Sequence, residues 1–497
     1  MAMKGISRIR AHTANVSRVT TGLKDSLIEK FSHDPRLNKC IEDAEVALEG
    51  KLKEQGGSSF IKDEAAMFSS LQEGYCNFYH PHSIMPQIPL AAKGPWIVTL
   101  HGAVIHDSGG YGMLGFGHNP DFLMDAVGSS HCMANVMTPS FSQAEFMKAI
   151  RKSIGWSRGG CPFDQFVCMN SGSEAVEFSA RLTDVDAKLK TQKGGVHEGR
   201  RVQMMSMKGG FYGRTYRPAR LSESCRDTYR EHLASFQYPE CHMPIAVEPN
   251  NVEDLEKAFA YAEENNIHIE ACYLEPVMGE GKPGEIMTKE FYKKARELTK
   301  KHHSILIADC IQASLRATGS LSICDYPGFE DVDAPDMETY SKALNAGQYP
   351  LSVLAIQQHV ADVHVPGLYG NTMTTNPRAL DIGATVLNAV TPQIRENILD
   401  KGIEMQELFT KISKEHPAVF SGATGSGLLQ AIHLSKDMKM FGGNQPGSES
   451  VLARCRMSGL GVINAAHTVK FTPHFELESD EIELMGEVLE DVAKSYS

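Results

Sequence analysis

The chain has 497 residues, of which 42% are hydrophobic and 22% charged, with 43 Gly and 23 Pro. These proportions exclude collagen-like and disordered chains, and the length indicates two or more domains or one large α/β unit. No stretch of the sequence is apolar for long enough to span a membrane. The formal net charge is -12 and the basic residues are scattered. We therefore expect a small-molecule substrate, and neither nucleic acid nor a membrane as a partner.

Cysteine usage and the N-terminus bear on the compartment. The eleven cysteines contain no Cys-x-x-Cys pair and show no regular spacing, which is typical of free thiols in a reducing compartment. Residues 1–24 hold five basic residues and no acidic one, with apolar residues at intervals. This pattern fits an amphipathic surface helix or a mitochondrial targeting segment. We expect a cytoplasmic protein, with the mitochondrial matrix as the alternative.

The predicted elements change along the chain. Residues 1–60 are helix-patterned and end in a Gly-Ser joint, and residues 96–100 and 103–105 predict two paired strands. Short apolar strands then alternate with amphipathic helices: the strands are predicted at 166–169, 271–274 and 304–308, and the helices from Ser173 and over 288–300. That alternation is typical of βαβ units and a mostly parallel sheet. Residues 376–497 predict a smaller α+β domain, with helices over 376–390, around 406–412 and from Glu478, and short strands near 428–432.

Two other patterns resemble ligand sites but lack the residues that such sites need. Gly110-Tyr-Gly112-Met-Leu-Gly115 matches the dinucleotide-binding G-x-G-x-x-G, but no helix is predicted at its third Gly and no acid follows at the required distance. His80-Pro-His82 and His302-His303 lack a second ligand pair at zinc spacing, so we expect no metal. The sequence also has no G-x-S-x-G elbow and no Walker A loop, which disfavours hydrolases and P-loop enzymes.

Four further features follow predicted strands. In Asn170-Ser-Gly-Ser173, Gly172 and Ser173 open a helix and could offer amides and a hydroxyl to a phosphate. In Lys208-Gly-Gly-Phe211-Tyr-Gly-Arg214, Phe211 could lie on a planar ligand. Alone, the first feature is also consistent with a helix N-cap and the second with a turn around a core Phe.

The other two features are charged. Asp309 ends a buried strand at the edge where open α/β sheets bind ligands, so it needs a cationic partner such as a protonated ring nitrogen. Lys342 follows another short strand, where an apolar crevice would make it a nucleophile toward an aldehyde. A phosphate cradle, a stacking aromatic, a buried acid and a Schiff-base lysine are together what pyridoxal 5'-phosphate requires.

With these residues the chain resembles the class III aminotransferases of the fold-type I pyridoxal-phosphate superfamily, over roughly residues 75 to 490. The resemblance rests on these motifs: Gly115-Phe-Gly-His118-Asn-Pro, Asn170-Ser-Gly-Ser-Glu-Ala-Val-Glu177, Gly210-Phe-Tyr-Gly-Arg-Thr215, Glu275-Pro-Val-Met-Gly-Glu-Gly281, Asp309-Cys-Ile-Gln312, Ser341-Lys-Ala-Leu344 and Thr372-Met-Thr-Thr-Asn-Pro377. It implies an α/β fold with a mainly parallel seven-stranded sheet flanked by helices and a smaller α+β domain. The implied divisions are an N-terminal helical segment over 1–95 that joins the small domain, a large cofactor-binding domain over 96–375 and a small domain over 376–497.

The resemblance also implies roles for single residues. Lys342 would form the Schiff base and shuttle a proton, and Asp309 would keep the ring nitrogen protonated. Further cofactor contacts would come from Gly172, Ser173, Phe211, Tyr212, Ile311, Gln312 and, at the phosphate bound by the neighbouring subunit, Thr372. Such an enzyme would be a homodimer with shared active sites.

The implied reaction moves the terminal amine of an ω-amino or diamino acid, such as lysine or ornithine, to an oxo acid such as 2-oxoglutarate in ping-pong order. Tyr79 and Arg214 match positions that hold the donor carboxylate, and a structural role is the alternative for both. Glu280 matches the acid that pairs with an arginine near the end of the family's chains, but Lys470 stands where that arginine is expected. Lysine keeps the charge and loses the bidentate fork.

A second departure follows Asp309, where the family's usual D-E-x-Q-T-G-x-G-R-T-G is altered. The acid after Asp309 is replaced by Cys310, and Arg316 lies one place early. We interpret this as a divergent branch with altered specificity. A racemase, aminomutase or decarboxylase of the same family remains an alternative function, as does a catalytically silent scaffold.

Overall fold

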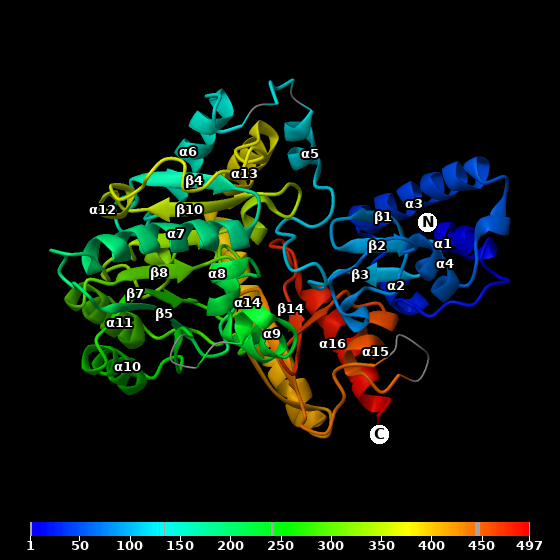
Figure 1. Ribbon diagram of the computed structural model, residues 1–497. Coiled ribbons are helices and arrows are strands. Elements are labelled where there is room, and N and C mark those ends of the chain that lie inside the picture. Colours follow the sequence, from blue (N-terminus) through cyan, green and yellow to red (C-terminus); the bar gives the residue numbers. More distant parts are fainter. Residues whose placement is uncertain are drawn as a thin grey trace. The chain divides into compact units, whose positions relative to one another are not determined.

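The computed structural model describes residues 2–128, 130–133, 135–237, 239, 243–442 and 448–496. The chain forms two compact units (Figure 1): unit 1 comprises Met1–Met124 and Asp400–Ser497, and unit 2 comprises Asp125–Leu399. These divisions differ from the expected boundaries at 95 and 375. Residues 96–124 group with the C-terminal residues because Thr472 donates hydrogen bonds to the carbonyls of Ser108, at 3.0 Å, and Gly109, at 3.1 Å.

Unit 2 is built on a seven-stranded sheet in the order β4-β10-β9-β8-β7-β5-β6. Its strands are β4 (Gln165–Met169), β5 (Arg201–Met207), β6 (Ile245–Val247), β7 (Ile267–Leu274), β8 (Ile305–Asp309), β9 (Met337–Tyr340) and β10 (Ser352–Ile356). β10 runs antiparallel to both of its neighbours, and the other neighbouring pairs are parallel. The predicted α/β class with a mainly parallel sheet is confirmed.

Helices cover both faces of this sheet. α7 (Gly172–Thr191) carries the chain from β4 toward β5, whereas α10 (Val252–Glu264) and α11 (Lys289–Lys301) carry it back toward β8. Connections between parallel strands are right-handed, so a helix that leads toward one edge of the sheet and a helix that leads toward the other edge lie on opposite faces. α7 therefore covers one face, and α10 and α11 cover the other (Figure 1). Val176, Phe178 and Leu182 of α7 pack with sheet residues such as Tyr273 and Ile307 in one buried core.

The other helices of unit 2 are α6 (Phe141–Ser153), α8 (Tyr216–Leu221), α9 (Arg226–His232), α12 (Gln358–Ala361) and α13 (Pro377–Ala389). α5 (Asp121–Val127) and α14 (Pro392–Glu415) run across the divisions between the units. α11 and α13 match the predicted helices within one residue at each end. α14 is longer than the predicted 406–412, because an earlier turn of the same helix begins at Pro392 and buries Ile398.

Unit 1 holds two antiparallel sheets. One consists of β1 (Pro89–Lys93), β2 (Trp96–Thr99) and β3 (Val104–His106), and β2 and β3 are the predicted strand pair. The other has the order β11-β12-β14-β13, formed by β11 (Phe420–Ser426), β12 (Leu429–Leu434), β13 (Ile463–Ala465) and β14 (Thr468–Phe471). The helices are α1 (Ala2–Ala11), α2 (Asp25–Lys30), α3 (Pro35–Glu54), α4 (Glu64–Leu71), α15 (Val451–Met457) and α16 (Ser479–Lys494). These elements give unit 1 the α+β character that was expected of the smaller domain, within other bounds than the predicted 376–497.

The amphipathic N-terminal segment is helical and packed. Ile6 and Ile9 of α1 are buried, and a Cβ added at Gly5 would lie 2.4 Å from Cγ2 of Ile41 on α3. Within the described ranges, no helix combines the length and apolarity needed to cross a bilayer.

Candidate active site

The residues expected to bind a cofactor gather at one edge of the unit 2 sheet. β4, β5, β7, β8 and β9 all run in the same direction, so their carboxyl ends meet at that edge. The start of α7 follows β4, the Phe211 loop follows β5, the Glu280 loop follows β7, Asp309 ends β8, and Lys342 follows β9. In open α/β sheets this edge is where ligands bind.

The start of α7 packs closely against two other loops. A capping box between Ser171 and Glu174 begins the helix. An added Cβ at Gly172 would lie 2.7 Å from Cδ1 of Ile311, so only glycine allows this approach without displacing Ile311. The N–H of Arg214 donates to Oγ of Ser173 at 2.9 Å. Backbone amides and a hydroxyl at a helix N-terminus suit a phosphate.

The loop after β5 holds Phe211 through a buried carboxyl group. Oε1 of Glu275 accepts the N–H of Phe211 at 2.7 Å, and Oε2 accepts the N–H of Gly279 at 3.2 Å. Burial, together with the charge of Asp309, raises the pKa of Glu275 to about 8. Sequence reasoning gave Glu275 no role, although its place directly after an apolar strand and before a proline was the available signal.

Tyr212 lies in the core of unit 2. Its side chain is 1% exposed, and its hydroxyl donates to the carbonyl of Tyr273 at 3.0 Å. Its N–H donates to Oγ of Ser222 at 2.8 Å. The phenol therefore anchors the loop that carries its neighbour Phe211.

Asp309 presents one satisfied and one unsatisfied oxygen. Oδ1 accepts the N–H of Ile311 at 3.0 Å, whereas Oδ2 is buried with no hydrogen-bond partner among the described residues. Burial raises the pKa of Asp309 to about 6, against the hydrogen bond from Ile311, the nearby hydroxyl of Thr339 and the charge of Lys342, which all lower it. A buried carboxylate oxygen without a partner is costly, and a protonated ring nitrogen would satisfy it.

Lys342 lies one strand away from Asp309. In the parallel pairing of β8 with β9, Asp309 is opposite Thr339, three residues before Lys342. Lys342 is half-buried, begins the 3₁₀ helix η7 (Lys342–Asn345) and has φ +48°, in the left-handed region. Strained backbone of this kind is concentrated at functional sites in proteins.

Gln312 and Glu280 are bonded to each other. Nε2 of Gln312 donates to Oε1 of Glu280 at 3.0 Å. Glycine at position 279 permits the approach, because an added Cβ would lie 2.2 Å from Cδ of Gln312. Gln312, which is expected at the cofactor, and Glu280, which is expected at the substrate, are thus joined by a hydrogen bond.

Three further expected residues are Thr372, Tyr79 and Lys470. Thr372 is exposed in unit 2, and its carbonyl accepts a hydrogen bond from Asn135 at 2.9 Å. Tyr79 and Lys470 belong to unit 1. Tyr79 is exposed in the segment before β1, whereas Lys470 is buried in β14, opposite Ala431 of β12.

One group of three described residues has the spacing of metal ligands, namely His106, His474 and Glu481 in unit 1. Nε2 of His474 lies 3.1 Å from Oε1 of Glu481, but that oxygen also accepts a hydrogen bond from Arg36 at 3.3 Å. The other oxygen accepts the N–H of Glu478 at 2.8 Å. Because both oxygens already have protein donors, we interpret the group as a buried hydrogen-bond network.

Comparison with known proteins identifies the family of the chain. Residues 79–493 match the family described as Aminotransferase class-III. The acetylornithine aminotransferase of Prochlorococcus marinus subsp. pastoris is 28% identical over 341 residues, 66% of this chain and 73% of the relative. The ornithine aminotransferase of Staphylococcus epidermidis is 28% identical over 380 residues, 73% of this chain and 86% of the relative.

Solved structures share the fold. The ornithine aminotransferase of Toxoplasma gondii superposes with a TM-score of 0.71 at 20% identity, covering 88% of this chain and 96% of that one. An amine transaminase of an uncultivated Pseudomonas species, in its PLP-bound form, superposes with a TM-score of 0.68 at 18% identity, covering 85% and 97%. The chain therefore belongs to the class III aminotransferases, fold-type I enzymes whose cofactor is pyridoxal 5'-phosphate.

Proposed function

We propose that this aminotransferase moves the terminal amine of an ω-amino or diamino acid, such as ornithine or lysine, to 2-oxoglutarate, and that it does so at the edge of the unit 2 sheet. The observation that carries the proposal is the buried Oδ2 of Asp309, which accepts no hydrogen bond of ordinary geometry among the described residues, with Lys342 at the end of the adjacent strand. A cationic ring nitrogen would satisfy the first group, and an aldehyde would react with the second.

The surrounding residues fit the rest of the cofactor. Gly172 and Ser173 would hold the phosphate, while Phe211 and Ile311 would lie on the two faces of the ring. Gln312 would reach the ring hydroxyl. When bound, pyridoxal phosphate supplies an electron sink that stabilises charge released from the amine-bearing carbon.

Lys342 is the proposed acid and base. Its Nζ would take the proton from the donor carbon, hold it and give it back within the same site, and water would supply the oxygen of the carbonyl product. The charge of Asp309 would keep the ring nitrogen protonated throughout. Both groups act from the ends of neighbouring strands, so the sheet itself fixes their separation.

The preference for an ω-amine rests on the relatives and on Arg214. The relatives named above act on ornithine and acetylornithine according to their names. The guanidinium of Arg214 lies 5.4 Å from the centroid of the Phe211 ring, so a donor carboxylate bound there would leave the far amine free to reach the cofactor. Tyr79, Glu280 and Lys470 stay predicted substrate-binding residues, on the sequence resemblance alone.

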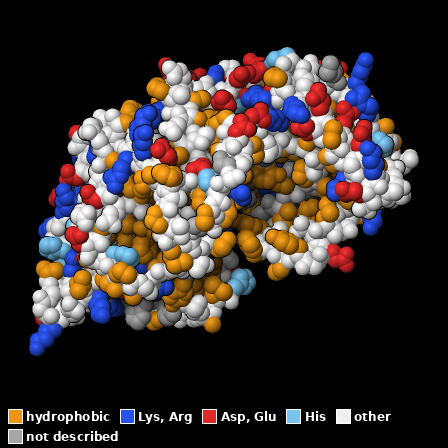
Figure 2. Space-filling view, turned by 90° about the horizontal axis from the view of Figure 1, so that it is seen from above, with side chains coloured by type: hydrophobic (Ala, Val, Ile, Leu, Met, Phe, Trp, Pro, Cys, Tyr) orange, Lys and Arg blue, Asp and Glu red, His pale blue; other side chains and the backbone are white. Residues whose placement is uncertain are grey.

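A homodimer with shared sites is part of the proposal. Large hydrophobic side chains of unit 2 are exposed in two segments, namely Met133, Val136, Met137 and Phe141 in one and Val365, Leu368 and Met373 in the other. The hydrogen bond from Asn135 to Thr372 joins these segments. Figure 2 shows hydrophobic side chains grouped on the face seen there. Exposed apolar patches of this kind mark interfaces, and Thr372 would reach the cofactor phosphate of the second subunit.

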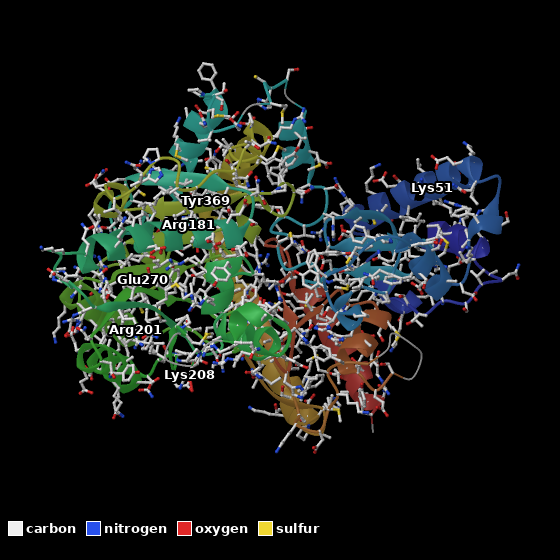
Figure 3. All side chains as sticks on the ribbon, viewed as in Figure 1. Lys51, Arg181, Arg201, Lys208, Glu270 and Tyr369 are labelled. Carbon is white, nitrogen blue, oxygen red and sulfur yellow. The ribbon has the colours of Figure 1, made fainter. Side chains whose placement is uncertain are left out.

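A comparison of two lysine variants tests the proposed function. Lys342→Ala should abolish transfer between each donor and 2-oxoglutarate while the fold is kept. Lys51→Ala is the matched control, since Lys51 is an exposed lysine on α3 (Figure 3). Equal loss of activity in both variants, or normal activity in Lys342→Ala, would contradict the proposal.

A further inference from the structure

A second buried carboxylate lies next to the residue that departs from the family pattern. Glu338 of β9 is 0% exposed. Its position is opposite Ala308 in the pairing of β8 with β9, one residue before the Asp309–Thr339 pair. Side chains alternate between faces along a strand, so Glu338 points to the face opposite the one that Asp309 uses.

Cys310 points to the same face as Glu338. Its Sγ lies 3.9 Å from Oε1 of Glu338, and its N–H donates to the carbonyl of Thr339 at 3.0 Å. The sequence resemblance implies an acid at position 310, where this chain has Cys310. The carboxyl group of Glu338 lies beside this position, on the neighbouring strand β9.

The donors to Glu338 show what this carboxyl group holds in place. Oε1 accepts the N–H of Ile323 at 3.1 Å, and Oε2 accepts the hydroxyl of Tyr340. Ile323 begins the 3₁₀ helix η6 (Ile323–Asp325), which closes the segment that starts at Asp309. Asp325, at the end of η6, accepts the N–H groups of Gly155, at 2.6 Å, and Ser157, at 2.9 Å.

We propose that Glu338 is a positioning residue for the cofactor site: it supplies from β9 the carboxylate that Cys310 no longer provides, and so fixes the segment that carries Asp309, Ile311 and Gln312. The substitution at position 310 and the acid at position 338 then form a compensating pair. This inference rests on the proposed placement of Asp309 at the cofactor ring.

A double-mutant cycle measures this compensation directly. The quantity is the dissociation constant of pyridoxal phosphate, obtained by absorption titration of the cofactor-free full-length protein, for wild type, Glu338→Leu, Cys310→Glu and the double variant. Glu338→Leu should weaken binding about tenfold, equivalent to one lost hydrogen bond. Cys310→Glu should weaken it similarly, because it buries a second acid beside Glu338. The double variant should return to within about threefold of wild type, which a purely additive pair would not do.

Glu270 provides the control for a general loss of stability. It is also a buried acid of this sheet, on β7 (Figure 3), and it accepts hydrogen bonds from Arg217 and Thr183. Glu270→Leu should lower the melting temperature of the cofactor-free protein and leave the dissociation constant unchanged. A dissociation constant that rises in proportion to the fall in melting temperature across all variants, Glu270→Leu included, would overturn the positioning role.

The remaining outcomes are also decisive. Unchanged cofactor binding in Glu338→Leu, or a double variant no tighter than the weaker single variant, would overturn the inference. If Glu338→Leu does not fold, the affinity of Cys310→Glu for pyridoxal phosphate decides. Wild-type affinity in that variant would overturn the inference, because a second carboxyl group beside Glu338 would then have no effect on the site. Asp309→Ala separates this inference from the proposed function: unaltered cofactor binding there would refute the proposed site itself.

Discussion

The backbone N–H of Phe211 donates to the side chain of Glu275 at 2.7 Å, across 64 positions of sequence. The second oxygen of the same carboxyl group accepts the N–H of Gly279. One buried acid therefore fixes both the loop after β5 and the loop after β7. The position of Phe211, which we propose to stack on the cofactor ring, therefore depends on Glu275.

Replacing Glu275 with Ala should destabilise the protein and weaken cofactor binding. The change leaves two buried N–H groups unpaired, and each costs about 1–3 kcal/mol. Denaturant unfolding of the cofactor-free protein measures the loss. Glu253→Ala, at an exposed position of α10, is the control and should change stability by no more than about 0.5 kcal/mol. Equal losses in the two variants would refute the bridging role.

The raised pKa values predict how stability depends on pH. The pKa of Glu275 is about 8 and that of Asp309 about 6, each raised chiefly by burial. Between the ordinary pKa of a carboxyl group, about 4, and these raised pKa values, the folded state binds more protons than the unfolded state. The free energy of unfolding therefore falls as pH rises through this range. Melting temperatures of the cofactor-free protein should decline from about pH 5 to pH 8, and Glu275→Gln should flatten the decline. A wild-type profile that rises over this window would be inconsistent with the buried acids.

The left-handed backbone at Lys342 predicts a difference between two inactive variants. At φ +48° a side chain with a Cβ is strained, and glycine is not. Lys342→Gly should therefore be more stable than Lys342→Ala by about 1 kcal/mol, although neither variant should turn over. Thermal unfolding of both cofactor-free variants gives the comparison. The reverse order of stability would argue against this conformation.

Gly213 is expected to tolerate no side chain. Its φ is +113°, and an added Cβ would lie 2.3 Å from Oγ of Ser173 and 3.0 Å from its Cα. Gly213→Ala should cost about 1–3 kcal/mol of stability and lower the affinity for pyridoxal phosphate, because Ser173 must move. Gly50→Ala is a suitable control, since Gly50 lies in α3 with nothing within 4 Å of the added Cβ. That helical variant should be neutral or more stable.

The unit 1 network predicts a different pH response. Burial alone would raise the pKa of Glu481, but His474 and His106 outweigh it and hold the pKa well below its usual range. The stabilisation is therefore present above the ordinary pKa of a glutamate and is lost as pH falls below it. Glu481→Gln should be less stable than wild type by about 3 kcal/mol at pH 7, and the difference should shrink below about pH 4. A difference that stays constant with pH would contradict the network.

Local signals in the sequence predicted much of the fold and of the site. The apolar run before Asp309 identified a strand end, and Gly172 with Ser173 identified a helix start, because both signals come from residues that are neighbours in the sequence. The direction of β10 could not be predicted, since an apolar run is the same for a parallel and an antiparallel strand. The Glu275 bridge and the grouping of residues 96–124 with Thr472 depend on contacts between distant segments, which periodicity does not reveal.

The central claim is that Lys342 and Asp309 form the cofactor site of an ω-amine transaminase. The most direct measurement is the visible absorption of the purified enzyme with pyridoxal phosphate, after addition of ornithine, lysine or 4-aminobutyrate and then of 2-oxoglutarate. We expect the cofactor band to bleach with at least one of these amines and to return with the oxo acid, and we expect neither change in Lys342→Ala. A wild-type band that no donor bleaches, or a full cycle of bleaching and return in Lys342→Ala, would contradict the claim.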